Sequence, residues 1–273
     1  MRSTVERLLV RTWNLFHGNT KPPGRKAFLE EMVRLASADR PDVVCFQELP
    51  VWSLDHLARW SGMTAVTDVA KRPLPGTVEL GRIVTDLNHG LFRSAFTGQA
   101  NALLLSERLS LLEHRHVVLN AFRFRRTQAR FLGLTRRERL AWARERRVCQ
   151  AIRVVRDGRT IVVANLHATS YSADRRLADA ELLRAAVFVD GFALPDEPVL
   201  LCGDFNLSVR TSRTLAELMA GEWGFSGATP TGIDHILVRG LQADTPSVWP
   251  PERRTDSSGR LLSDHAPVER NVE

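Results

Sequence analysis

Short apolar runs rich in β-branched residues recur along the whole chain, and amphipathic helical patterns separate them. This alternation constrains the fold more than any other feature, because each run has the length of one buried strand. Many strands that share one core with a few helices favour an α+β layered sandwich. Strands are expected at residues 8–13, 42–46, 101–105, 111–119, 148–155, 160–166, 199–202, 233–238, 243–248 and 266–270.

Turn and capping signals connect these strands. Thr135 begins the sequence TRRE, a capping-box pattern that predicts a helix at 136–146. Asp157-Gly158 predicts a tight hairpin between the runs on either side of it. The runs 101–105 and 111–119 are expected to pair with each other. Residues 71–90 are expected to form a loop, and further helices are expected at 25–38, 54–60, 174–188 and 212–220.

The composition is that of an ordinary globular protein, with 44% hydrophobic and 25% charged residues. No apolar run has the roughly 18 residues needed for a transmembrane helix, and the start of the chain predicts no leader peptide. The three cysteines all lie in apolar runs, so they are expected to be buried thiols in a reducing, cytoplasmic compartment. Their spacing excludes a zinc finger or ribbon. No protein partner is predicted.

Basic residues are concentrated in residues 122–147, called the basic segment below. The segment contains ten arginines, no lysine and two glutamates, so its net charge is +8. Because the whole chain carries +7, the remainder carries −1. The segment either binds polyanions such as nucleic acid, lipid phosphates or a membrane surface, or is only a solvated arginine-rich helix. Its aromatic residues either stack on unpaired bases or, the favoured interpretation, pack against the core: Phe122, Phe124, Phe131 and Trp142.

Polar side chains follow several of the predicted strands at the point where each strand ends. A single residue of this kind usually caps a strand or forms a turn, but six separate occurrences suggest that the side chains meet at one sheet edge. The set combines carboxylates, carboxamides and histidines and contains no thiol or obvious nucleophilic serine. Hard oxygen ligands point to Mg²⁺ or Mn²⁺, and the histidines to stabilisation of negative charge on oxygen. The pattern therefore predicts metal-assisted hydrolysis of a phosphate ester.

The order of these motifs resembles the endonuclease/exonuclease/phosphatase superfamily. That superfamily includes pancreatic-type deoxyribonucleases, abasic-site endonucleases, neutral sphingomyelinases, deadenylases and inositol polyphosphate 5-phosphatases. The resemblance implies a four-layer α/β/β/α sandwich with two packed mixed sheets, and one domain over residues 1–273 with a basic insertion at about 120–147. The motifs are TWN (12–14), FQE (46–48), NLH (165–167), GDFN (203–206), IDHI (233–236) and SDH (263–265).

The resemblance implies a metal site and a catalytic site. Glu48 is expected to be the central metal ligand, with its carboxylate aimed by Asn14, and Asp264 a second carboxylate beside the metal. The metal is expected to be Mg²⁺, with Mn²⁺ as an alternative.

The catalytic groups follow from the same motifs. Asp204 is expected to orient or deprotonate water, and Asn206 to hydrogen-bond water or phosphate. His265 is expected to face the scissile phosphate with its ring held by Asp234, while His167 donates to a second phosphate oxygen. Whether Asp204 or His265 is the general base stays open.

Differences between this chain and individual subfamilies of the superfamily reduce the number of substrate classes to consider. Inositol 5-phosphatases have an arginine soon after GDxN and a W-C/T-D-R segment, where this chain has GDFNLS and GIDHIL. Abasic endonucleases usually have tyrosine at the position of His167, and NLH is closer to deoxyribonucleases and sphingomyelinases. A nuclease acting on DNA or RNA is therefore expected. The alternatives are a phosphomonoesterase, a sphingomyelinase-like phospholipid diesterase, or a non-catalytic polyanion-binding module.

A few residues outside the motifs are candidates for substrate contact. Arg136 and Arg137 belong to the predicted helix of the basic segment, Arg147 leads into the following strand, and Asn101 opens a strand. Two neighbouring polar residues are given other roles. His235 is expected to pack on the face opposite Asp234. His17, just past Asn14, either touches substrate or, the favoured interpretation, belongs to a loop.

Overall fold

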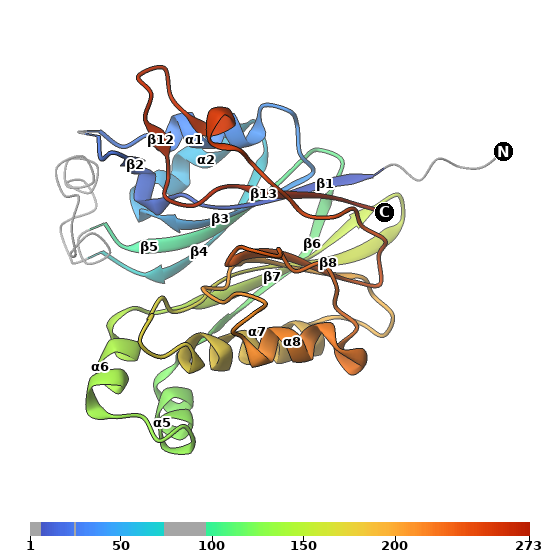
Figure 1. Ribbon diagram of the computed structural model, residues 1–273. Helices are drawn as coiled ribbons and strands as arrows, with labels where there is room; N and C mark the ends of the chain where they lie inside the picture. Colours follow the sequence, from blue (N-terminus) through green and yellow to red (C-terminus); the bar gives the residue numbers. More distant parts are fainter. Residues whose placement is uncertain (1–6, 25, 74–96) are drawn as a thin grey trace.

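The computed structural model describes residues 7–24, 26–73 and 97–273 (Figure 1). Two mixed β-sheets pack face to face, and helices cover their outer faces. Helices α1 (Leu29–Ser37) and α2 (Leu57–Ser61) lie on one sheet, and α7 (Arg176–Phe192) and α8 (Arg213–Met219) lie on the other. This arrangement confirms the predicted four-layer sandwich.

The first sheet has the strand order β11-β13-β1-β3-β5-β4, and only β1 and β3 in it are parallel. Its strands are β11 (Ser247–Val248), β13 (Val268–Val272), β1 (Leu8–Asn14), β3 (Val43–Leu49), β5 (Gln99–Leu105) and β4 (Thr64–Lys71).

The second sheet has the order β10-β9-β8-β7-β6, with β8 and β9 parallel. Its strands are β10 (Asp234–Arg239), β9 (Val199–Asp204), β8 (Arg159–His167), β7 (Val148–Arg156) and β6 (Ser110–Val118). A short ribbon joins β2 (Thr20–Lys21) to β12 (Leu261–Leu262). Short 3₁₀ helices lie at η1 (Phe16–Gly18), η2 (Val51–His56), η3 (Gly221–Trp223) and η4 (Pro251–Arg254).

Alternation of side chains across each strand produces the core. The inward faces of the two sheets bury aliphatic residues such as Val10, Ile152 and Ile236 between them. The opposite faces pack against the helices, as Met32 does on α1 and Leu182 on α7. All three cysteines are buried free thiols, as expected. Among the described residues, no helix is both long and apolar enough to cross a membrane.

The strand directions bring the motif residues to one edge. Parallel pairing places Asn14 at the end of β1 next to Gln47 on β3, and His167 at the end of β8 next to Asp204 on β9. Strand β10 is antiparallel to β9, so its first residue, Asp234, lies opposite Asp204. Because the two sheets pack with these ends on the same side, residues far apart in sequence form one polar cluster.

Buried amides connect the two sheets behind this edge. The Gln47 Nε2 atom donates to Asn165 Oδ1 at 2.7 Å and to Thr12 Oγ1 at 3.0 Å. Asn165 in turn donates to the carbonyl oxygens of Phe46 and Ala102, each at 3.0 Å. All of these side chains are in the dry interior, where an unpaired amide would be destabilising, so they hold the sheets in one alignment.

The basic segment is an enlarged hairpin connection between β6 and β7. These strands stay paired up to Val118 opposite Val148, and the Leu119 amide donates to the Arg147 carbonyl at 2.8 Å. Helices α5 (Phe122–Phe131) and α6 (Arg136–Arg144) lie between these two points. Thr135 and Glu138 form the predicted capping box at the start of α6, whereas α5 was not predicted.

Further expectations differ from the structure, including the strand expected at 243–248, of which only Ser247–Val248 forms a strand. Residues 101–105 and 111–119 do not pair, because β5 already has β3 and β4 on its two edges, and β6 joins the other sheet beside β7. Helix α1 starts at Leu29 rather than at residue 25, and α7 extends to Phe192. Most of the predicted loop at 71–90, from residue 74 onward, lies outside the described residues.

Candidate active site

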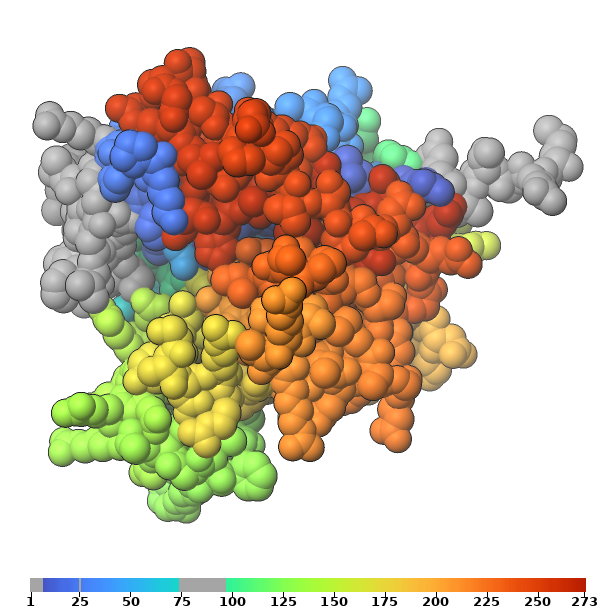
Figure 2. All heavy atoms as spheres, viewed as in Figure 1, coloured from blue at the N-terminus to red at the C-terminus, as the bar shows by residue number. Residues whose placement is uncertain are grey.

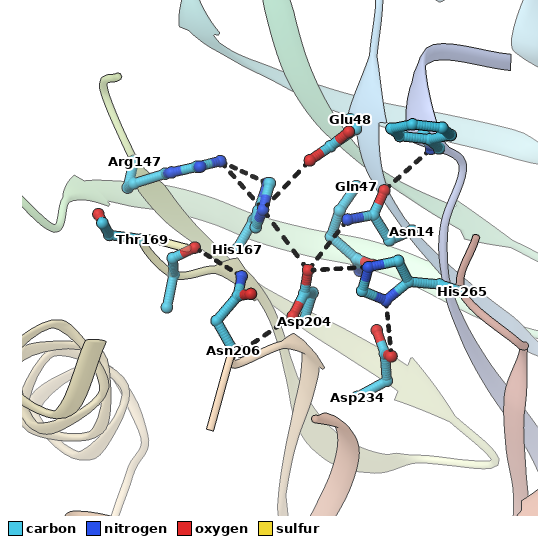
Figure 3. Close-up of polar contacts among 12 residues, drawn as sticks. Asn14, Gln47, Glu48, Arg147, His167, Thr169, Asp204, Asn206, Asp234 and His265 are labelled. Carbon is cyan, nitrogen blue, oxygen red and sulfur yellow. Dashed lines mark hydrogen bonds and ion pairs between the residues drawn. The ribbon is translucent and has the colours of Figure 1, made fainter. Parts of the chain in front are cut away.

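Asp204 lies at the centre of the polar cluster, and its side chain is almost fully buried (Figure 3). Asn14 Nδ2 donates to its Oδ2 at 3.0 Å, and the Asn206 amide donates to its Oδ1 at 2.9 Å. Burial and the nearby charge of Asp234 raise the pKa of Asp204 to about 6. The preceding Gly203 has φ +135°, and a Cβ there would lie 1.9 Å from the Leu166 carbonyl oxygen, so only glycine fits.

A histidine–carboxylate pair faces Asp204. His265 Nδ1 lies 2.8 Å from Asp234 Oδ2, and its Nε2 lies 3.8 Å from Asp204 Oδ2. Burial alone would lower the pKa of His265, but the charge of Asp234 and this hydrogen bond raise it to about 10. The backbone is fixed as well, since Trp13 Nε1 donates to the His265 carbonyl at 3.0 Å. His265 is therefore a cation at neutral pH.

Glu48 reaches the cluster through an irregularity in β3. The register with β5 shifts between Phe46 and Leu49, and Glu48 has φ +56°. Its Oε1 lies 3.6 Å from His167 Nε2, and its Oε2 lies 3.8 Å from His17 Nε2. Burial raises the pKa of Glu48 to about 7, with the charge of Arg147 opposing the rise and that of Asp204 adding to it.

His167 lies between a cation and two carboxylates. Arg147 Nη1 is 2.9 Å from its Nδ1, and Gln99 Nε2 is 3.2 Å from the same atom. Its Nε2 is 3.6 Å from both Glu48 Oε1 and Asp204 Oδ2. Arg147 Nη1 also lies 3.0 Å from Nε2, so the same donor faces both ring nitrogens and the contacts select neither tautomer. Burial and the charge of Arg147 hold the pKa of His167 well below its usual value, so the ring is neutral.

Comparisons with known proteins agree with this arrangement. A family model described as the endonuclease/exonuclease/phosphatase family matches residues 12–265. The chain belongs to this family. As a member of the endonuclease/exonuclease/phosphatase family, it is a phosphate-ester hydrolase. No curated protein sequence matches the chain.

Solved structures with the same fold have low sequence identity to this family member. An endonuclease/exonuclease/phosphatase from Bacteroides vulgatus is 12% identical, with a TM-score of 0.67, and the match covers 98% of this chain and 99% of that one. The human Nocturnin catalytic domain with a bound sulfate anion is 16% identical, with a TM-score of 0.67 and coverage of 98% and 93%. A functionally unknown conserved protein from Enterococcus faecalis is 15% identical, with a TM-score of 0.66 and coverage of 97% and 99%.

The family is metal dependent, and the carboxylates of this member fit a divalent cation. The buried oxygens Asp234 Oδ1 and Asp264 Oδ1 accept no hydrogen bond. Like charge also contributes to the raised pKa of Glu48, and a cation would relieve that repulsion. Asp204, Asp234 and His265 offer atoms within 4.8 Å of one another. The carboxylates of Glu48 and Asp264 are further oxygen donors of the kind that a divalent cation prefers.

Most of the residues expected from the motifs lie in or beside this cluster. Asn14 contacts Asp204 rather than Glu48, since its oxygen accepts from the Phe16 amide while its nitrogen donates to Asp204. Asp264 lies beside the cluster, with its Oδ1 4.0 Å from His265 Nε2 and its Oδ2 3.9 Å from Lys21 Nζ. The labelled group in Figure 3 comprises Asn14, Gln47, Glu48, Arg147, His167, Thr169, Asp204, Asn206, Asp234 and His265.

The residues proposed from outside the motifs divide into two groups. Arg147 contacts His167, as described above. Arg136 and Arg137 are exposed on α6 and contact none of the motif residues among the described parts of the chain. Asn101 is buried, and its amide donates to the Val148 carbonyl at 3.3 Å, which links the sheets.

Some contacts of the site were not predicted. Gln99 contacts His167 although its sequence context, GQANALLL, carries no catalytic signal. His17, for which a loop position is the favoured interpretation of the sequence, lies beside Glu48. His235 packs as expected: its Nδ1 accepts from the Thr229 amide, and its Nε2 lies 2.8 Å from the Leu207 carbonyl.

Proposed function

We propose that this protein is a Mg²⁺-dependent phosphodiesterase that cleaves nucleic acid by in-line attack of water. The observation that carries the proposal is the placement of a cationic His265 and a neutral His167 around the buried carboxylate of Asp204. Hydrogen-bond donors held in a dry site stabilise the charge that develops on phosphoryl oxygens in the transition state. A single domain over residues 1–273 and a cytoplasmic location, supported by the three free thiols, are part of the proposal.

In this proposal each group of the cluster has a separate task. Asp204 accepts the proton of the attacking water, because its pKa of about 6 lies near the operating pH. His265 stays protonated on account of Asp234 and donates to a phosphoryl oxygen, so its raised pKa supports Asp204 over His265 as the general base. A divalent cation held by Glu48 and Asp264 would polarise a phosphoryl oxygen as a Lewis acid.

Three further polar groups lie beside the space proposed for the phosphate. His167 Nε2 lies 3.6 Å from both Glu48 Oε1 and Asp204 Oδ2, so a hydrogen on it would point between them. Arg147 Nη1 adds a positive charge 2.9 Å from Nδ1 of the same ring. Asn206, with φ +52°, uses one amide hydrogen on the Ala168 carbonyl at 3.0 Å and keeps the second for substrate.

A polyanionic substrate is supported by charge. The basic segment carries a net charge of +8 and leads directly into Arg147, so the surface beside the cluster on this side attracts polyanions. The sulfate bound to the related catalytic domain of human Nocturnin agrees with binding of a tetrahedral oxyanion by this fold.

The test is hydrolysis of bis-p-nitrophenyl phosphate with Mg²⁺ or Mn²⁺, with and without EDTA. Metal-dependent turnover is expected, and Asp204→Ala should lower kcat by about 10² or more. Asp190→Asn is the matched control, because this carboxylate pairs with Arg239 on the surface. Full turnover in Asp204→Ala, or turnover unaffected by EDTA, would defeat the proposal. Plasmid DNA, single-stranded RNA, sphingomyelin and inositol phosphates in one buffer then identify the ester class.

A further inference from the structure

The helices α5 and α6 expose aromatic and basic side chains together. Phe122 is 69% exposed and Phe131 is 84% exposed, although large apolar side chains normally avoid water. Their neighbours Arg126 and Arg130 are exposed and have no acidic partner among the described residues. The other two aromatics of the basic segment pack inward instead, Phe124 edge-on against Trp142 at 6.0 Å.

Two adjoining hollows lie on the helical pair, and both are lined by Phe122. One hollow of about 250 Å³ is lined by Phe122, Arg125, Arg126, Ala129, Arg130, Arg139 and Trp142. A second, of about 290 Å³, lies nearer β7 and shares Phe122 and Arg125 with the first. Each is larger than the roughly 150 Å³ cavity that holds a benzene ring, so a nucleobase can enter. The second hollow includes Glu145 and Arg146, which directly precede Arg147.

The base of the helical pair is rigidly joined to the catalytic edge. The Asn120 side chain accepts from the Arg147 amide at 2.9 Å and donates to the carbonyls of Trp142 and Glu145. Trp142 Nε1 donates to the buried Glu181 at 2.6 Å, and Glu181 also accepts from the Thr169 amide, two residues after His167. A ligand on α5 and α6 is therefore held in a defined position relative to the site.

The distribution of the exposed apolar side chains favours bases over lipid. Phe122 and Phe131 are nine residues apart on α5, which places them on opposite sides of the helix at about 100° per residue. A helix that lies in a membrane interface has one continuous apolar face, and arginines separate the two rings here. Isolated rings between arginines suit stacking on separate, non-adjacent bases of one strand, with contacts to the phosphates between them.

We propose that α5 and α6 bind an unpaired nucleic-acid strand and direct it to the catalytic edge. The two helices project from the sandwich as a separate lobe, drawn in green in Figure 2. This inference rests on the proposed nuclease function and adds a preference for single strands. In a duplex the base faces are stacked on each other and are not accessible to the two phenylalanines.

Binding is tested by fluorescence anisotropy of labelled 20-nucleotide single strands of DNA and RNA, the matching duplexes, and phosphatidylserine vesicles, in EDTA. Single strands should bind more tightly than duplex or vesicles. Phe122→Ala should weaken single-strand binding about tenfold, since stacking contributes strongly per base. Arg126→Glu should reduce the slope of log affinity against log salt, which is about 0.7 per neutralised phosphate. Val187→Ala and Arg210→Glu are matched controls at exposed positions on other elements.

The outcomes separate this inference from the proposed function. Equal affinity for duplex and single strand, tighter binding to vesicles, or single-strand affinity unchanged in Phe122→Ala would overturn the docking surface. With Mg²⁺ present, Phe122→Ala should also lower single-strand cleavage about tenfold relative to bis-p-nitrophenyl phosphate turnover, and an unchanged ratio would count against it. Failure of the unsubstituted protein to hydrolyse bis-p-nitrophenyl phosphate would instead defeat the phosphodiesterase assignment.

Discussion

The pairing of His265 with Asp234 makes a prediction about charge that can be measured directly. In Asp234→Asn the carboxylate that faces His265 Nδ1 at 2.8 Å becomes neutral. Burial of the ring, which lowers the pKa of His265, is then opposed only by the more distant charges of Asp204 and Asp264. We expect His265 to lose most of its positive charge at pH 7.5 in this variant.

The size of the effect follows from the pKa. A rise from 6.5 to about 10 is about 3.5 units, or at most about 5 kcal/mol in favour of the protonated ring. A raised histidine pKa stabilises the fold below pH 6.5, and that contribution is lost as the pH rises from 6.5 to about 10. The same electrostatic loss should lower kcat by about 10²–10⁴ at pH 7.5.

The assay is an NMR titration of the histidine ring resonances, combined with kcat measured on bis-p-nitrophenyl phosphate. In the unsubstituted protein His265 should stay protonated beyond pH 9, and in Asp234→Asn it should titrate several units lower. Asp190→Asn serves again as the control, and it should leave the titration of His265 unchanged. A pKa for His265 that is equally high in Asp234→Asn would refute the reasoning, as would a pKa near 6.5 in the unsubstituted protein.

Three other predictions concern the metal, the interior and the arginine. The pKa values of Glu48 and Asp204 are raised in the fold, so the metal-free protein loses stability as the pH rises from about 4 to 7. Mg²⁺ should therefore raise Tm more at pH 8 than at pH 5. Equal shifts in Tm at the two pH values would argue against ligation of the metal by these carboxylates. Gln47→Ala should lower the free energy of unfolding in urea by about 1–3 kcal/mol, because Asn165 Oδ1 loses a buried donor; an unchanged midpoint would contradict this. Arg147→Ala should raise the pKa of His167 and lower kcat/KM about 10²-fold, and kinetics equal to those of the unsubstituted protein would remove Arg147 from the site.

The architecture was predictable from sequence where local signals were strong. The capping box at Thr135 and the Asp157-Gly158 turn fix their own neighbourhoods, and both are found as expected. Strand pairing could not be predicted in this way, because it depends on which strand edges in each sheet are already paired with other strands. Nothing in residues 101–105 shows that β5 has partners on both sides, so its predicted pairing with the next strand was wrong.

The site was predictable as a set of residues but not as a set of contacts. The motifs bring Asp204, His265 and Glu48 together because they lie at strand ends on one edge. The positive φ of Glu48 comes from the irregular register of β3, which the letters FQE do not reveal. Gln99 was not predicted because the sequence alone does not distinguish a strand amide that hydrogen-bonds within its sheet from one that contacts a histidine.

The continuous pairing of Val118 with Val148 has a consequence for how this protein could diversify. The strands on either side of α5 and α6 already meet, so the sandwich does not depend on the helices to close the connection. The connection can change length and composition while the core residues of the sheets stay the same. The helices can thus change without a change in the sheets, as long as Arg147 stays in contact with His167 at the catalytic edge.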